Sequence, residues 1–219
     1  MRISKREVKT IISFLEEVWE NEESLVKRYS SLKGKTPFQI LVSTILSLRT
    51  KDEITYSVAS ELFKDLKEAR DFVEISTKEL ERMIYPVGFY RNKAKAIKKI
   101  AKEILEKYGG NVPANIDDLL NLPGVGRKTA NLVLSTAFGK NVICVDTHVH
   151  RISNRLGLVN TKTPEETEVE LMKVLPKNYW KKINHLMVSF GQTICKPVKP
   201  RCDVCKLVDL CKYYQSLRR

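Results

Sequence analysis

LPGVGRKTANLVLSTAFGKNVICVD, residues 122–146, carries the most specific structural signal in this sequence. The Gly-Val-Gly sequence at 124–126 predicts a turn too tight for side chains, because glycine alone adopts positive φ without steric cost. Residues 127–138 follow with a helical pattern, and the amides at a helix start attract anions. Lys128 lies in the first turn of this helix, where a cation is unfavourable for helix stability, so we interpret it as a residue with a chemical task. The stretch predicts a hairpin between two helices that holds a phosphate.

The overall charge favours a polyanionic partner. The 219 residues contain 39 Lys and Arg against 26 Asp and Glu, a net charge of +13, which indicates nucleic acid rather than an acidic small molecule. The longest apolar run, at 38–48, is too short to span a bilayer and contains polar residues, so no membrane association is expected. The N-terminus is charged throughout and is not a signal peptide, which predicts a cytoplasmic protein.

Helical periodicity recurs along the chain, and alternating β patterns are absent, so we predict an all-α protein. Capping boxes are predicted at Ser4 with Glu7, at Thr36 with Gln39 and at Thr50 with Glu53. Asp146 is expected to cap the helix that ends at Gly157. The predicted helices cover residues 4–19, 36–48, 50–63, 76–84, 91–108, 115–120, 127–138, 146–157, 163–175 and 179–193.

Four of the five cysteines, Cys195, Cys202, Cys205 and Cys211, lie in a C-terminal tail rich in proline and basic residues. This density predicts a metal site, because disulfides are rare in a cytosolic chain and two cysteines separated by two residues rarely pair. The spacing is compatible with tetrahedral zinc and with an iron–sulfur cluster. The fifth cysteine, Cys144, lies in an apolar run and is interpreted as a small buried hydrophobic residue.

Several segments together resemble the endonuclease III family of helix-hairpin-helix DNA glycosylases. They are LPGVGRKTA at 122–130, VDTHVHRISNRLGL at 145–158 and the C-x6-C-x2-C-x5-C tail; the segments at 36–52 and 87–97 also resemble earlier segments of that family. The resemblance implies a bifunctional enzyme that excises oxidised pyrimidines such as thymine glycol and then nicks the abasic strand. It also implies a 4Fe-4S cluster on the four tail cysteines. The implied fold has a six-helix barrel at about 30–140 and a second domain of residues 1–29 and 141–219 that carries the cluster.

The resemblance assigns roles to individual residues. Lys128 matches the family's nucleophile and Asp146 its essential carboxylate. The hairpin matches the element that grips the DNA phosphates, with DNA-binding residues Leu122, Gly124, Val125, Gly126 and Arg127. Relatives commonly carry glutamine where this chain has Arg49, and often leucine where it has Phe89; we expect both to insert into the duplex with an altered preference for the opposite base.

Three functions are therefore compared. The first is a glycosylase and abasic-site lyase that acts on double-stranded damaged DNA as a monomer, associated with the nucleoid if the source is a prokaryote. The second is a mismatch or adenine glycosylase on the same scaffold that uses activated water; Lys128 disfavours it, because those relatives usually lack lysine there. The third is a non-catalytic DNA-binding module that uses an iron–sulfur centre in redox sensing, in which Lys128 and Asp146 would have no catalytic role.

Overall fold

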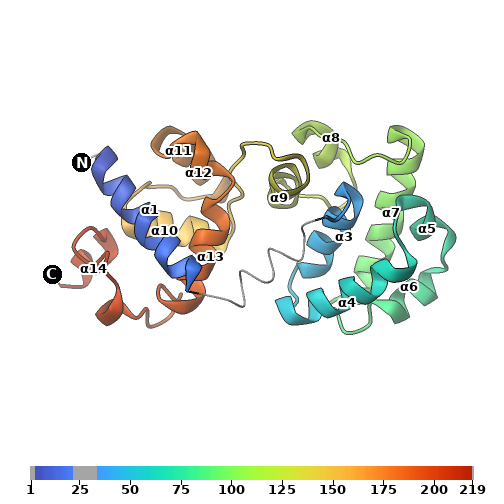
Figure 1. Cartoon of the computed structure of the whole chain (residues 1–219), viewed down its shortest axis with the longest axis horizontal. Helices are drawn as coiled ribbons and strands as arrows, with labels where there is room; N and C mark the ends of the chain where they lie inside the picture. Colours follow the sequence, from blue (N-terminus) through green and yellow to red (C-terminus); the bar gives the residue numbers. More distant parts are fainter. Residues whose placement is uncertain (1–2, 22–33, 219) are drawn as a thin grey trace. The chain divides into compact units, whose positions relative to one another are not determined.

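The computed structural model describes residues 3–21 and 34–218, and all regular structure in these ranges is helical, which confirms the all-α prediction. Figure 1 shows the succession of helices along the chain. The helices are α1 (Lys5–Glu20), α3 (Pro37–Ser47), α4 (Asp52–Asp65), α5 (Ala69–Glu74), α6 (Thr77–Met83), α7 (Tyr90–Tyr108), α8 (Ile116–Asn121), α9 (Arg127–Phe138), α10 (Thr147–Leu156), α11 (Pro164–Val174), α12 (Lys177–Trp180), α13 (Ile183–Thr193), a 3₁₀ turn (Cys202–Val204) and α14 (Lys212–Leu217).

The chain forms two compact units. We call Arg28–Lys140 the internal unit, and Met1–Lys27 together with Asn141–Arg219 the terminal unit. The domain boundary predicted at residues 29 and 30 lies outside the described residues.

The internal unit is organised around α3, which packs against α4, α7 and α9. Nearly every side chain of α3 from Phe38 to Leu46 is buried, and the Phe38 ring meets Phe72 of α5 edge-on at 5.3 Å between centroids. The helix starts at the predicted capping box, in which the Thr36 hydroxyl accepts from the Gln39 amide and the Gln39 side chain accepts from the Thr36 amide. A helix apolar on all sides belongs in a core, and α3 fixes the positions of the helices around it.

Helix α7 carries two lysines that reach the ends of other helices. The Lys93 ammonium donates to the carbonyls of Leu46 and Leu48 where α3 ends, and the Lys98 ammonium donates to Phe72 and Val73 at the end of α5. Neither α3 nor α5 has a basic residue in its own last turn. The two lysines therefore satisfy carbonyls that have no partner within their own helix.

The capping box predicted at Thr50 is wrong. Helix α4 is capped at Lys51 without a side-chain hydrogen bond. The Thr50 hydroxyl instead accepts from the Lys93 ammonium at 2.9 Å and from the Gly88 amide at 3.1 Å. A partner from a distant segment has replaced the local cap.

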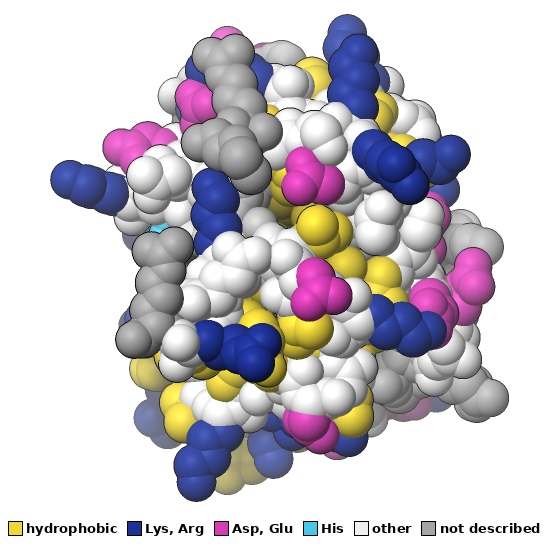
Figure 2. Space-filling model, turned by 90° about the vertical axis from the view of Figure 1, so that its left-hand side faces the viewer, with side chains coloured by type: hydrophobic (Ala, Val, Ile, Leu, Met, Phe, Trp, Pro, Cys, Tyr) yellow, Lys and Arg dark blue, Asp and Glu magenta, His cyan; other side chains and the backbone are white. Residues whose placement is uncertain are grey.

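In the terminal unit, α1 and α10 both pack against α13, and their apolar faces form one core that includes Leu15, Ile152 and Phe190. The predicted capping box at Ser4 is confirmed. On the face that Figure 2 draws, lysine and arginine side chains are scattered, with hydrophobic side chains exposed between them. The positive charge on this face is therefore not confined to one patch.

Four differences separate the predicted helices from those observed. Helix α5 and the tail helix α14 are additional, and a 3₁₀ turn interrupts the cysteine tail. The helix predicted at 179–193 is broken into α12 and α13. At the break the Lys182 amide donates a hydrogen bond to the Tyr179 carbonyl at 2.9 Å, and the Trp180 indole donates to the Leu175 carbonyl at 3.0 Å.

Candidate functional site

The turn between α8 and α9 has the tight geometry that its glycines predict. Gly124 adopts φ +79°, and the Val125 amide donates to the Leu122 carbonyl at 3.1 Å. The Leu122 and Val125 side chains are only 2% and 5% exposed. Of the residues predicted to bind DNA here, these two therefore anchor the turn with their side chains, and the turn itself exposes Gly124 and Gly126.

The first turn of α9 presents positive charge to solvent. Its N-cap is Gly126, which has no side chain to satisfy the first amides, and the first turn contains no acidic residue. Arg127 and Lys128 occupy the first two helical positions and are exposed. Backbone amides and cations at one helix start make a site suited to phosphate.

Asp146 caps α10, as predicted, in the terminal unit. Its Oδ1 atom accepts from the His148 amide at 2.9 Å and from the Val149 amide at 2.8 Å, and the side chain is half-buried. Both bonds use one oxygen and fix the plane of the carboxylate. The second oxygen is not used by these cap bonds.

The same helix holds the cysteine tail at its other end. Arg151 donates to the Cys195 carbonyl at 2.9 Å. Arg155 donates to the Lys196 carbonyl at 2.8 Å, to the Pro197 carbonyl at 2.9 Å and to the Cys195 sulfur at 3.5 Å. Neither arginine was predicted as a partner of the tail, although their i, i+4 spacing places them on one face of α10. A single helix therefore connects the Asp146 carboxylate to the cysteine loop.

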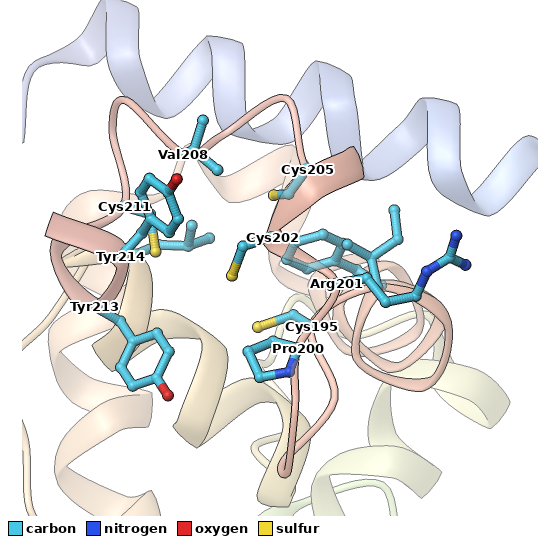
Figure 3. Close-up of a pocket in the computed structure, with 12 residues that line it drawn as sticks. Cys195, Pro200, Arg201, Cys202, Cys205, Val208, Cys211, Tyr213 and Tyr214 are labelled. Atoms are coloured by element: carbon cyan, nitrogen blue, oxygen red, sulfur yellow. The ribbon is translucent and has the colours of Figure 1, made fainter. Parts of the chain in front are cut away.

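Figure 3 shows the four tail cysteines and Tyr213 around one pocket. Leu156 and Phe190 also line it. The space encloses about 340 Å³, part of it open to solvent. None of the four cysteines is paired in a disulfide. Burial raises the pKa of the Cys205 thiol to about 11, and it also raises the pKa of Cys202 and Cys211. Cys144 lies apart and is buried, which confirms the interpretation of a small hydrophobic residue.

Within residues 3–21 and 34–218, no three His, Cys, Asp or Glu side chains form a group that could hold one metal ion. The donor set is nevertheless four thiols in one pocket with arginine donors beside it, a chemistry suited to an anionic thiolate cluster.

Arg49 and Phe89 are brought together in the internal unit. Arg49 follows the end of α3, Phe89 is the N-cap of α7, and the Arg49 guanidinium carbon lies 5.7 Å from the Phe89 ring centroid. Phe89 is 61% exposed, so it is not a core aromatic, and Arg49 is exposed as well. The structure therefore presents a cation and an aromatic ring side by side to solvent.

Lys93 lies directly beneath this pair. It is only 8% exposed, and burial lowers its pKa to about 8. A buried lysine of lowered pKa is a candidate nucleophile. Its ammonium, however, donates to three oxygens, those of Leu46, Leu48 and Thr50. All of its protons are in use, so this amine is held in its structural role as a donor.

Comparison with known proteins decides the family. A model of the HhH-GPD superfamily of base excision DNA repair proteins matches residues 42–177. Endonuclease III of Thermotoga maritima is 48% identical over 192 residues, which cover 87% of this chain and 90% of that protein. The chain belongs to the endonuclease III family. It is accordingly a base excision repair DNA glycosylase with abasic-site lyase activity.

Solved structures agree with this assignment. A trapped covalent intermediate of an endonuclease III with DNA has a TM-score of 0.83 and 38% identity, covering 96% of this chain and 98% of that one. A thermostable thymine-DNA glycosylase has a TM-score of 0.85 with 27% identity and the same coverage. The scaffold is therefore shared with a protein named as a thymine-DNA glycosylase, so the scaffold by itself does not select the base that is removed.

Across residues 3–21 and 34–218, no helix combines the length and the apolar character needed to cross a bilayer.

Proposed function

We propose that this endonuclease III family member removes oxidised pyrimidines of the thymine glycol class from double-stranded DNA, with Lys128 as nucleophile and Asp146 as the essential carboxylate. The observation that carries the proposal is the placement of Lys128, which is exposed in the first turn of α9 directly after the glycine hairpin. A cation there opposes the helix dipole, so helix stability does not explain it. An amine beside a phosphate-binding turn does have a use in a reaction at the adjacent sugar.

Lys128 would attack the anomeric carbon of the damaged nucleotide as a neutral amine. Its nitrogen forms a bond to that carbon as the glycosidic bond breaks, and the base leaves with the bonding electrons and is protonated. The amine then loses a proton, the sugar ring opens and a Schiff base forms. This imine acidifies the neighbouring sugar position, so that loss of a proton expels the 3′ phosphate by β-elimination. The solved covalent intermediate of a relative with DNA supports a covalent route.

Asp146 would accept the proton from the attacking amine and stabilise the positive charge that develops on the sugar as the base leaves. Its cap bonds to the His148 and Val149 amides support this role, because they hold the carboxylate in one orientation. A preorganised charge costs little to reorient when the reaction occurs.

Arg49 and Phe89 would fill the gap in the duplex when the damaged nucleotide is extruded. Aromatic and basic side chains at a groove commonly act in this way, because a ring stacks on bases and a guanidinium donates to base edges. Their exposure and their mutual contact support a joint insertion.

Cys195, Cys202, Cys205 and Cys211 would hold a 4Fe-4S cluster. Four thiols in one pocket, with Arg155 donating toward Cys195, support this ligand set. The cluster would contribute structural stability and a redox centre, and the neighbouring arginines and lysines would offset its negative charge. Iron and acid-labile sulfide in the purified protein, both lost in Cys202→Ser, test this part; zinc in place of iron would contradict it.

The experiment that tests the reaction is borohydride trapping on a duplex that contains thymine glycol. The wild-type protein should give a covalent protein–DNA complex in the presence of a chelator, and Lys128→Gln should give none. Trapping that persists in the variant would reject Lys128 as nucleophile.

A further inference from the structure

Arg49 and Phe89 share an unusual backbone conformation. Their φ angles are +52° and +57°, in the left-handed region that favours glycine. A side chain is disfavoured there by a factor of about five or more for each residue. Such conformations persist only where the surrounding structure holds them in place, so both exposed residues must be held by contacts beneath them.

The two backbones touch directly. The Gly88 amide donates to the Thr50 hydroxyl at 3.1 Å, which joins the residue after Arg49 to the residue before Phe89. A Cβ atom at Gly88 would lie 2.7 Å from the Arg49 carbonyl oxygen. The approach is closer than any side chain at position 88 permits, so the segments 48–50 and 88–89 form one packed element.

Lys93 joins both segments. Its backbone amide donates to the Phe89 carbonyl at 3.1 Å in the first turn of α7. Its buried ammonium donates to the Thr50 hydroxyl at 2.9 Å and to the Leu48 carbonyl, on either side of Arg49. The amide bond belongs to the first turn of α7, and the ammonium ties this turn to the segment that carries Arg49.

We infer that Lys93 is a positioning residue that holds Arg49 and Phe89 together in their left-handed conformations, so that they form a preformed wedge for opening the duplex. The inference rests on the proposed function, in which these two side chains enter the DNA. A preformed wedge avoids the entropy cost of ordering two loops when the side chains enter the duplex. Lys93 itself is buried beneath the wedge, so in this role it contacts other residues of the protein and not the DNA.

The test compares Lys93→Met with Lys98→Met. Methionine keeps most of the apolar bulk of lysine and removes the ammonium. Lys98 is a matched control, because it lies on the same helix and its ammonium also donates to three oxygens, those of Phe72, Val73 and Ile75. These acceptors are remote from Arg49 and Phe89 in the chain, so loss of this ammonium removes a helix-end contact without releasing the wedge.

Two substrates separate duplex opening from chemistry. One is a duplex with a single thymine glycol, which must be extruded from the stack. The other is a single-stranded oligonucleotide with one abasic site, where no base pair is opened. We expect Lys93→Met to slow single-turnover excision from the duplex about tenfold and to leave nicking of the single strand within about twofold of wild type. Lys98→Met should leave both rates within about twofold.

Thr50→Val provides a second variant if Lys93→Met does not fold, because it removes only the shared hydroxyl. We expect it to slow duplex excision about threefold, again with single-strand nicking retained. Equal loss on both substrates, or duplex excision at the wild-type rate, would overturn the positioning role. A wild-type protein that nicks neither substrate would instead reject the proposed function, so the two failures are distinct.

Discussion

Replacing Asp146 by asparagine and by alanine should separate its role as a helix cap from its role as a carboxylate. The Oδ1 atom accepts two amide bonds, of 2.9 Å from His148 and 2.8 Å from Val149. An asparagine oxygen can accept the same bonds, whereas alanine loses them. We expect Asp146→Ala to lower the free energy of unfolding by about 1 kcal/mol. Asp146→Asn should cost about 0.5 kcal/mol, from loss of a negative charge at the start of α10.

Asp146→Asn, the variant with the smaller loss of stability, should nevertheless lose most of its excision rate. Because asparagine cannot accept the proton of the attacking amine, we expect Asp146→Asn to slow excision about 100-fold or more. Unfolding in urea gives the stability change, and single-turnover excision of thymine glycol from a duplex gives the rate. Asp146→Asn excising at the wild-type rate would show that the residue is a cap and nothing more. A loss of stability in Asp146→Asn equal to that in Asp146→Ala would refute the cap geometry.

Two further predictions follow from the packing. Gly88→Ala places a Cβ atom 2.7 Å from the Arg49 carbonyl oxygen, so the segments must separate; we expect urea unfolding to show a loss of about 1–3 kcal/mol, with slower excision from the duplex. Unchanged stability and rate would show that the Arg49 carbonyl can move away from residue 88 without loss of free energy or activity. The pKa of His185 is lowered from 6.5 to about 4, first by burial and then by the charge of Lys182, so the folded state favours the neutral ring. The unfolded state binds the His185 proton more tightly than the folded state does. The free energy of unfolding therefore has its full value above pH 6.5 and falls by on the order of 3 kcal/mol as the pH is lowered toward 4. His185→Phe should flatten the dependence of the unfolding free energy on pH in this window, and a wild-type dependence that persists in the variant would contradict the assignment.

Local signals in the sequence were enough to predict many helix starts. The caps at Ser4, Thr36 and Asp146 are confirmed, because each depends on residues three or fewer positions apart. Thr50 shows where such signals fail. It has the same local pattern as Thr36, but Lys93, distant in sequence and adjacent in the fold, takes its hydroxyl. Tertiary contacts override local preference, and one sequence does not reveal which contacts form.

The candidate site shows the same division. The hairpin at 122–126 could be predicted because the Gly-Val-Gly pattern before a helix is typical of a tight turn, and Gly124 does adopt positive φ. Lys93 lies four residues before Ile97 on the buried face of α7, so its burial follows from the periodicity, but its acceptors could not be predicted because they lie in a distant segment. Nor could the left-handed conformation of Phe89 be read from its identity, because non-glycine residues adopt it only when contacts from elsewhere hold them.

The pairing of α1 with α13 brings together segments from the two ends of the described chain. On the ribosome, α1 emerges before the internal unit, and the helix that covers its apolar face emerges only after all of the internal unit has been synthesised. The internal unit is continuous in sequence and has its partners available earlier, so it can fold while the nascent chain is still being extended. The hydrophobic face of α1, including Leu15, must meanwhile stay in solution or be shielded by a chaperone until translation reaches α13.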